Sequence, residues 1–388
     1  MRVPLLDLTR QYADLADSIE PEVQRLCRSQ QFILGPEVER FETELAAHTG
    51  AAHCVGVSSG TDGQLALLMA MGLGAGDAVV TTPFTFFATA GCLHRLGIEI
   101  LFADIDPETF NLDPQAVERL LNQLRYRNGS LWSERGNQVR CLLPVHLFGQ
   151  CADMTAINQL AARFELDVIE DSAQAIGAFY GGQQAGAMGR ASWFSFFPSK
   201  NLGAFGDAGA VTCQEPDLAE RIRAIRNHGM TAPYTHTGVG GNFRLDALQA
   251  LVLRKKLPHL NRWTELRRAH ASYYNQQWEE RAIQDRVCGP RIAHESSFGP
   301  AHIYHQYVIR SRHRDALKAH LDERGIGNAI YYPTPLHQQP CFASLGYGAG
   351  ACPVSEQASR EVLALPVFPE LTEEERHAVV EEVVGFFG

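Results

Sequence analysis

The sequence predicts an α/β protein built around a largely parallel β-sheet. From residue 53 onward, short apolar segments alternate with amphipathic segments of helical period, which is the pattern of repeated β-α units. The strand segments are almost continuously apolar, as expected for strands covered by helices on both faces. The chain has 388 residues, which is enough for two or more domains with sizeable cores.

The elements of the first part of the chain follow from this periodicity. Two helices are predicted before the first strand, at residues 11–26 and 36–48, joined by an apolar turn. Strands are predicted at 54–57, 78–82, 98–104, 141–146, 167–170, 193–197 and 208–213. Helices are predicted at 62–71, 88–96, 114–124, 154–164 and 216–226. Residues 125–138 are polar and interrupt this alternation, so we expect them to form an exposed insertion.

The C-terminal part of the chain has a different pattern. Residues 245–278 are predominantly helical and interrupted near Pro258, because proline cannot continue a helix without breaking it. Further elements are predicted as a strand at 304–310, a helix at 314–324, a proline-rich loop at 332–340 and a helix from Glu373. We therefore expect an N-terminal arm and a large domain over residues 1–250, and a small α/β domain over 251–388.

The composition excludes several classes of protein. The net charge is −10, and the chain has no dense Lys/Arg run that would bind nucleic acid. Its nine cysteines are scattered without CxxC pairs or His/Cys ligand spacing, so we expect reduced thiols and no metal site. The N-terminus lacks the apolar core of a signal peptide, and no apolar run is long enough to cross a membrane. A cytoplasmic enzyme is expected.

Residues with possible ligand-binding roles follow the predicted strands, where an open parallel sheet binds its ligands. Ser58-Ser59-Gly60-Thr61-Asp62 follows the first strand and begins a helix. Its glycine permits close approach of the backbone, and a helix N-terminus offers free N–H groups to an anion. An ordinary helix cap is the alternative.

Two further strand ends carry aromatic and acidic residues. Phe84 and Phe86 follow the second strand; either one stacks on a planar ligand or both belong to the core. Glu170 and Asp171 end a strand that should be buried, where a carboxylate is unfavourable unless it is paired. A structural helix cap by Asp171 is the alternative to a ligand contact.

Lys200 follows an aromatic strand and Pro198. Burial at such a strand end lowers the pKa of a lysine and makes its amine available for a Schiff base, although most lysines in such positions are solvated. Together the strand ends provide an anion site, an aromatic ring, a carboxylate and an amine. Pyridoxal 5'-phosphate requires all four, and a buried Asp keeps its ring nitrogen protonated. A dinucleotide-binding protein is disfavoured because no G-x-G-x-x-G follows the first strand.

The sequence resembles the DegT/DnrJ/EryC1/StrS family of nucleotide-sugar aminotransferases along essentially its whole length. The resemblance implies the fold type I, aspartate aminotransferase-like architecture, with a seven-stranded type of large sheet. It is carried by residues 32–42, Ser59-Gly60-Thr61, Pro83-Phe84-Thr85-Phe86, Pro144-Val145-His146-Leu147-Phe148-Gly149, Glu170-Asp171-Ser172-Ala173-Gln174, residues 195–200 and Gly241-Asn242-Phe243-Arg244.

The family resemblance implies roles around the cofactor ring. Lys200 would form the Schiff base with pyridoxal 5'-phosphate, and Asp171 would pair with the pyridinium nitrogen. Phe86 would stack on the ring, and Gln174 would lie near the phenolic oxygen. Lys200 also distinguishes this chain from family members that carry His there and act as dehydratases.

The resemblance implies roles at the cofactor phosphate as well. Gly60, Thr61 and Ser195 would bind the phosphate within one subunit. Asn242 would reach the phosphate of the other subunit's cofactor, so a homodimer with shared active sites is expected.

The resemblance also narrows the reaction to amino transfer from L-glutamate to a dTDP- or UDP-linked keto-deoxyhexose. Residues 201–207 resemble relatives that aminate C3, whereas relatives acting on C4 more often carry a Thr-Thr-Gly-Glu-like segment. By position only, the candidate sugar contacts are Tyr180, His228, Tyr331, Tyr332 and His337. Many C3 relatives have His-Tyr-Pro where this chain has Tyr331-Tyr332-Pro333. C4 amination, sugar dehydration and a non-catalytic regulator on the same fold are the alternatives.

Overall fold

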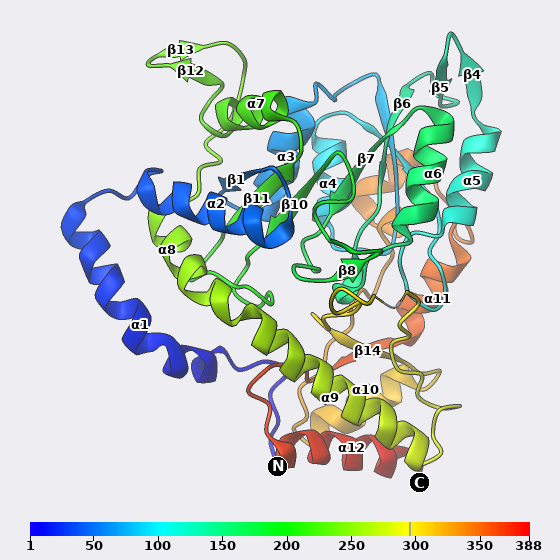
Figure 1. Ribbon diagram of the computed structural model, residues 1–388. Coiled ribbons are helices and arrows are strands. Elements are labelled where there is room, and N and C mark those ends of the chain that lie inside the picture. Colours follow the sequence, from blue (N-terminus) through cyan, green and yellow to red (C-terminus); the bar gives the residue numbers. More distant parts are fainter. Residues whose placement is uncertain (295) are drawn as a thin grey trace.

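The largest sheet of the molecule has nine strands, seven of which form its main path (Figure 1). The computed structural model describes residues 1–294 and 296–388. Along the main path, β11 runs antiparallel to both of its neighbours and the other pairs are parallel, which confirms the predicted mostly parallel sheet. In spatial order the strands are β1 (His53–Val57), β11 (Gly209–Cys213), β10 (Ala191–Ser195), β7 (Asp167–Asp171), β6 (Gln138–Leu143), β2 (Asp77–Thr81) and β3 (Glu99–Phe102).

Both faces of this sheet are covered by helices. Neighbouring residues of a strand point to opposite faces, so consecutive residues of β10 show which helices cover each face. Trp193 packs with α3, α4 and α7 on one face. Phe194, the next residue of β10, packs with α2 and α8 on the other face, where α5 and α6 cover the adjoining strands. These helices are α2 (Pro36–Thr49), α3 (Gly60–Ala70), α4 (Ala88–Arg95), α5 (Pro114–Gln123), α6 (Met154–Phe164), α7 (Pro216–Arg226) and α8 (Ala247–Lys256).

A second hydrophobic core lies in the C-terminal part of the chain. It surrounds the antiparallel pair of β14 (Tyr307–Arg310) and β15 (Val362–Leu365), and it includes Val3. The N-terminus of the chain lies beside α12 (Glu373–Phe387) (Figure 1). The interruption predicted near Pro258 is confirmed as a 3-10 turn at Leu257–His259. The predicted boundary after residue 250 falls within α8, and the division into two domains stays a prediction. The elements are α9 (Leu260–Glu280), β14 (Tyr307–Arg310), α10 (Arg314–Glu323), α11 (Pro353–Glu361), β15 (Val362–Leu365) and α12 (Glu373–Phe387).

The N-terminal arm is α1 (Leu8–Ser29), and two short hairpins extend from the loops of the large sheet. One hairpin pairs β8 (Phe179–Tyr180) with β9 (Gln183–Gln184), and the other pairs β12 (Met230–Ala232) with β13 (Thr235–His236). The second hairpin projects away from the large sheet beyond α7 (Figure 1). Among the helices of the described residues, none has the length and apolar character needed to span a membrane.

The segment at residues 125–138 is largely exposed, as predicted, but it also has secondary structure that the sequence analysis did not predict. β4 (Arg125–Arg127) and β5 (Ser130–Trp132) form a hairpin that pairs with β6 and so extends the large sheet. Leu131 is buried in the core beneath α5 and α6. The turn residues Asn128 and Gly129 both have positive φ, the conformation that a two-residue hairpin requires. The polar composition of the segment obscured this hairpin signal.

Candidate active site

A cavity of about 750 Å³ lies at the carboxyl ends of β1, β2, β7 and β10. Parallel strands end along one edge of a sheet, so the loops that follow them converge there. This volume is within the range of cavities that hold a cofactor or a small substrate. The predicted site residues that line it are Gly60, Thr61, Phe86, Asp171, Gln174, Ser195, Lys200, Tyr331 and Tyr332.

Lys200 is the only lysine among the residues that line this cavity. The chain turns after β10 through a hydrogen bond from the Lys200 N–H to the Phe197 carbonyl, 2.8 Å long. Gly203 is required in this turn because a Cβ atom there would lie 2.2 Å from the Pro198 carbonyl oxygen. Burial lowers the pKa of Lys200 to about 8, although the Asp171 carboxylate opposes this shift. The amine therefore loses its proton far more readily than that of a solvated lysine.

Asp171 is the last residue of β7 and has two hydrogen-bond donors. The Thr89 hydroxyl donates to Oδ2 at 2.8 Å, and the Ala173 N–H donates to Oδ1 at 3.1 Å. Burial nevertheless raises the pKa of Asp171, because both bonds only partly compensate for lost solvation. Thr89 lies within α4, and no pattern in the sequence identified it as a partner of this carboxylate.

The second carboxylate of this strand end has a structural environment. Glu170 is fully buried and accepts backbone N–H bonds from Gly186, Met188 and Gly189 at 2.7–2.9 Å. Its Oε2 also lies 2.9 Å from Nε2 of His146. His146 Nδ1 accepts the Ala152 N–H, so Nε2 carries the proton and donates to Glu170. Glu170 does not line the cavity, so Asp171 is the acidic residue that this strand end contributes to the cavity wall.

The N-terminus of α3 forms a candidate anion site. The Ser59 side chain caps the helix by accepting the Asp62 N–H at 3.0 Å, which leaves the N–H groups of Gly60 and Thr61 outside the helical pattern of hydrogen bonds. Ser195, at the end of β10, lies against Gly60: a Cβ atom on Gly60 would be 2.8 Å from Ser195 Cβ. The absence of a side chain at residue 60 therefore keeps this cradle open.

Replacing Gly60 with alanine is expected to raise the dissociation constant for pyridoxal 5'-phosphate by roughly 10–100-fold. Overpacking of this kind costs about 1–3 kcal/mol, and here it would separate the helix terminus from Ser195. Titration of the apoprotein with cofactor measures the constant. Gly385→Ala is a matched control because a Cβ atom there meets nothing within 4 Å. Equal constants for Gly60→Ala and the control would contradict a phosphate cradle at Gly60.

Gln174 connects two other parts of the cavity wall. Its Oε1 accepts the Phe148 N–H at 2.8 Å, which orients the amide so that Nε2 donates to the Tyr332 hydroxyl at 3.0 Å. Tyr332 therefore keeps its own hydroxyl proton for another acceptor. Tyr331 lies beside it in the cavity wall and is partly exposed. Phe86 is 58% exposed, so its ring is available to a planar ligand.

The remaining predicted residues do not line this cavity. Tyr180 donates to Asp153 at 2.6 Å, and His337 is buried beside Glu356, with 3.1 Å between Nε2 and Oε1. Asn242 and His228 are exposed near the base of the β12–β13 hairpin. Tyr180, His228 and His337 are therefore not part of the wall of this cavity, and their contact with a sugar stays a prediction.

The cavity thus combines an amine of lowered pKa, a buried carboxyl group, an exposed aromatic ring and a helix N-terminus. These groups fit pyridoxal 5'-phosphate: Gly60, Thr61 and Ser195 would hold the phosphate, Asp171 the ring nitrogen and Lys200 the aldehyde. The fold and the site define a pyridoxal-phosphate-dependent transaminase. The chain belongs to the DegT/DnrJ/EryC1/StrS aminotransferase family, which it matches over residues 13–384.

Individual relatives are similar to this chain along nearly its whole length. The "Pleiotropic regulatory protein" of Geobacillus stearothermophilus is 47% identical, covering 100% of this chain and 99% of the relative. The "UDP-N-acetyl-3-dehydro-alpha-D-glucosamine 3-aminotranferase" of Acidithiobacillus ferrooxidans is 39% identical, with 96% and 95% covered. The crystal structure of Streptomyces venezuelae DesV in complex with a ketimine intermediate superposes with a TM-score of 0.91 at 38% identity, with 99% and 98% covered. The predicted cofactor and fold type are confirmed.

Proposed function

We propose that this protein transfers the amino group of L-glutamate to the C3 keto group of a dTDP- or UDP-linked keto-deoxyhexose. The observation that carries the proposal is the pairing of Lys200 and Asp171 in one cavity, each with a pKa shifted by burial. The resemblance of residues 201–207 to enzymes that aminate C3 supports the position of the keto group. The name of the Acidithiobacillus ferrooxidans relative, a 3-aminotransferase, supports it too.

The reaction proceeds in two halves, with L-glutamate leaving as 2-oxoglutarate before the keto sugar is aminated. When bound, pyridoxal 5'-phosphate supplies an aldehyde for the amino group and a ring that withdraws electrons from the donor carbon. Lys200 Nζ accepts the proton that leaves the α-carbon of L-glutamate, since its lowered pKa leaves much of it neutral near pH 8. In the second half the same atom returns a proton to C3 of the sugar.

The other residues of the cavity hold the reacting groups in place. Asp171 stabilises a proton on the ring nitrogen, and Thr89 orients the carboxylate for that contact. Tyr331 and Tyr332 provide hydroxyl groups in the cavity wall, which we assign to the sugar. A tyrosine at residue 331 has a longer reach than the histidine of many C3 relatives, so it would select for the substituents of the hexose.

A homodimer with shared active sites is part of this proposal. Asn242 lies outside the cavity of its own chain and is exposed, as a residue that contacts the partner's cofactor would be. Tyr234, in the β12–β13 hairpin, is 95% exposed, and so it is free to pack on a second subunit. We also propose a cytoplasmic location, because no cysteine is disulfide-bonded in the part of the chain that the structure describes.

A panel of 3-keto and 4-keto sugars linked to dTDP or UDP tests the substrate. We expect mass spectrometry to find an aminated product from a 3-keto sugar and L-glutamate, with release of 2-oxoglutarate. Amination of the 4-keto sugars alone would overturn the C3 assignment and favour the C4 reaction.

A catalytically idle regulator is the second candidate, because the 47% identical relative is named a regulatory protein. The half-reaction with L-glutamate distinguishes the two, since it requires Lys200 to move a proton and needs no sugar. Formation of 2-oxoglutarate by the holoenzyme establishes a transaminase, and its absence with all tested amino donors would favour the regulator.

A further inference from the structure

His305 is a buried residue of the cavity wall that the sequence motifs do not identify. It precedes β14, more than a hundred residues after Lys200 in the chain, and it is 6% exposed. Its ring Nδ1 lies 3.1 Å from the side-chain oxygen of Asn201, the residue that follows Lys200. The segment before β14 therefore contributes the imidazole of His305 to the turn that carries Lys200.

The neighbouring hydrogen bonds determine which ring nitrogen of His305 carries the proton. Asn201 Nδ2 donates to the Ile303 carbonyl at 3.3 Å, so the amide oxygen of Asn201 faces His305. An amide oxygen only accepts hydrogen bonds, and Nδ1 of His305 must therefore be the donor. Nε2 is then an unprotonated acceptor, and no protein donor contacts it among the described residues.

The imidazole of His305 is held in its neutral form. Burial lowers the pKa of His305 well below its ordinary value, and the positive charges of Lys200 and Arg267 lower it further. A neutral acceptor with a fixed tautomer can accept a hydrogen bond from an N–H group but cannot act as an acid. The other titratable groups that line the cavity are Asp171, Asp207, Tyr331 and Tyr332, and none of them is bonded to His305.

We propose that His305 is a positioning residue for Lys200, whose amine donates to Nε2 of the imidazole when it holds the transferred proton. This hydrogen bond would keep the released amine of Lys200 in the cavity. It would also fix the orientation of the amine while it carries a proton from one carbon atom to another. Asn201 takes part only by fixing the tautomer of His305. This inference rests on the proposed transamination, which the glutamate half-reaction of the unaltered holoenzyme tests separately.

Single-turnover kinetics of the half-reaction with L-glutamate provide the first test. His305→Leu removes the acceptor, and we expect the rate constant to fall roughly 10–100-fold while the half-saturating glutamate concentration stays within about a factor of three. His305→Gln keeps a side-chain acceptor and should recover part of the rate. A normal half-reaction with a raised KM for the keto sugar would overturn the proposal and make His305 a sugar contact.

The second readout is the pKa of Lys200 in the apoenzyme, obtained from the pH dependence of unfolding with and without Lys200→Met. The folded pKa is about 8 and the ordinary value is 10.5, so the unfolded chain binds more protons between these values. Lys200→Met should therefore be the more stable form below about pH 8, and its advantage should vanish as the pH approaches 10.5. Loss of the acceptor in His305→Leu should lower the pH at which this advantage begins to decline.

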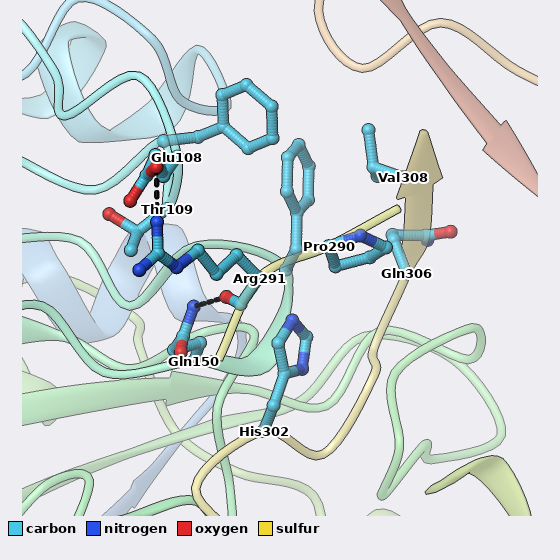
Figure 2. Close-up of a pocket in the computed structure, with 10 residues that line it drawn as sticks. Glu108, Thr109, Gln150, Pro290, Arg291, His302, Gln306 and Val308 are labelled. Atoms are coloured by element: carbon cyan, nitrogen blue, oxygen red, sulfur yellow. Dashed lines mark hydrogen bonds and ion pairs between the residues drawn. The ribbon is translucent and has the colours of Figure 1, made fainter. Parts of the chain in front are cut away.

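His302 offers a matched control, because it is a second buried histidine in the same segment and does not line the large cavity. Figure 2 shows it beside a separate space of about 10 Å³, with Gln150 and Arg291, which has room for about one water molecule. His302→Leu should leave the half-reaction and the pKa of Lys200 unchanged. If His305→Leu does not fold, His305→Ala decides, because it also removes the acceptor: an unchanged pKa of Lys200 together with an unchanged rate overturns the proposal.

Discussion

Replacing Lys200 with alanine is expected to slow the half-reaction with L-glutamate by roughly 10⁴-fold, the upper end of the range for a general acid–base group. No other residue lining the cavity carries an aliphatic amine, so no neighbour can take over the transfer of the proton. Rapid-mixing measurement of 2-oxoglutarate formation gives the rate constant for the variant loaded with cofactor.

The test separates a chemical role of Lys200 from a structural one. Lys318 lies on α10, where it forms an exposed ion pair with Asp322, and Lys318→Ala should retain the full rate. A small primary amine added to Lys200→Ala should restore part of the activity, since the space left by the side chain opens to the cavity. Full activity of Lys200→Ala without added amine would refute the assignment of Lys200.

Replacing Asp171 with asparagine is expected to lower the rate of the same half-reaction by roughly 10²–10³-fold, a typical effect of removing one electrostatic contact in a site that excludes water. The amide has nearly the shape of the carboxylate and can still accept from Thr89. It has no negative charge, however, and cannot stabilise a proton on the ring nitrogen of the cofactor. Cofactor affinity should fall much less than the rate constant.

Asp167 is the matched control for Asp171, because it is the first residue of the same strand and so lies at the end away from the cavity. Its ion pair with Arg190 is partly exposed, and Asp167→Asn should change stability slightly and the rate not at all. A rate for Asp171→Asn equal to that of Asp167→Asn would show that the charge of Asp171 has no part in the reaction.

Much of the fold and the centre of the site could be predicted because their signals are local. The parallel sheet follows from the period of apolar residues. Asp171 is the last residue of β7, Lys200 lies in the turn that follows β10, and Gly60 begins the helix after the first strand. The hairpin at residues 125–138 is also encoded locally, in Asn128-Gly129, but its strands are short and largely polar and lack the apolar pattern of the other strands.

Contacts between distant parts of the chain were not predictable from one sequence. Thr89 reaches Asp171 only because α4 lies against the end of β7, and His305 meets Asn201 only because the segment before β14 packs on the turn after Lys200. The same packing directs Tyr180 to Asp153 and His337 to Glu356, away from the cavity where their positions in the sequence suggested a role.

The division between sequence and structure has a physical basis. Hydrophobic periodicity and turn chemistry are properties of a few adjacent residues, and they were sufficient to predict the strand ends that carry the cofactor-binding groups. The tautomer of His305 and the orientation of Gln174 are set by partners that only the folded chain brings within hydrogen-bonding distance. The sequence by itself predicted the cofactor and the lysine that we propose to bind it, and only the tertiary structure placed Thr89 beside Asp171 and His305 beside Asn201.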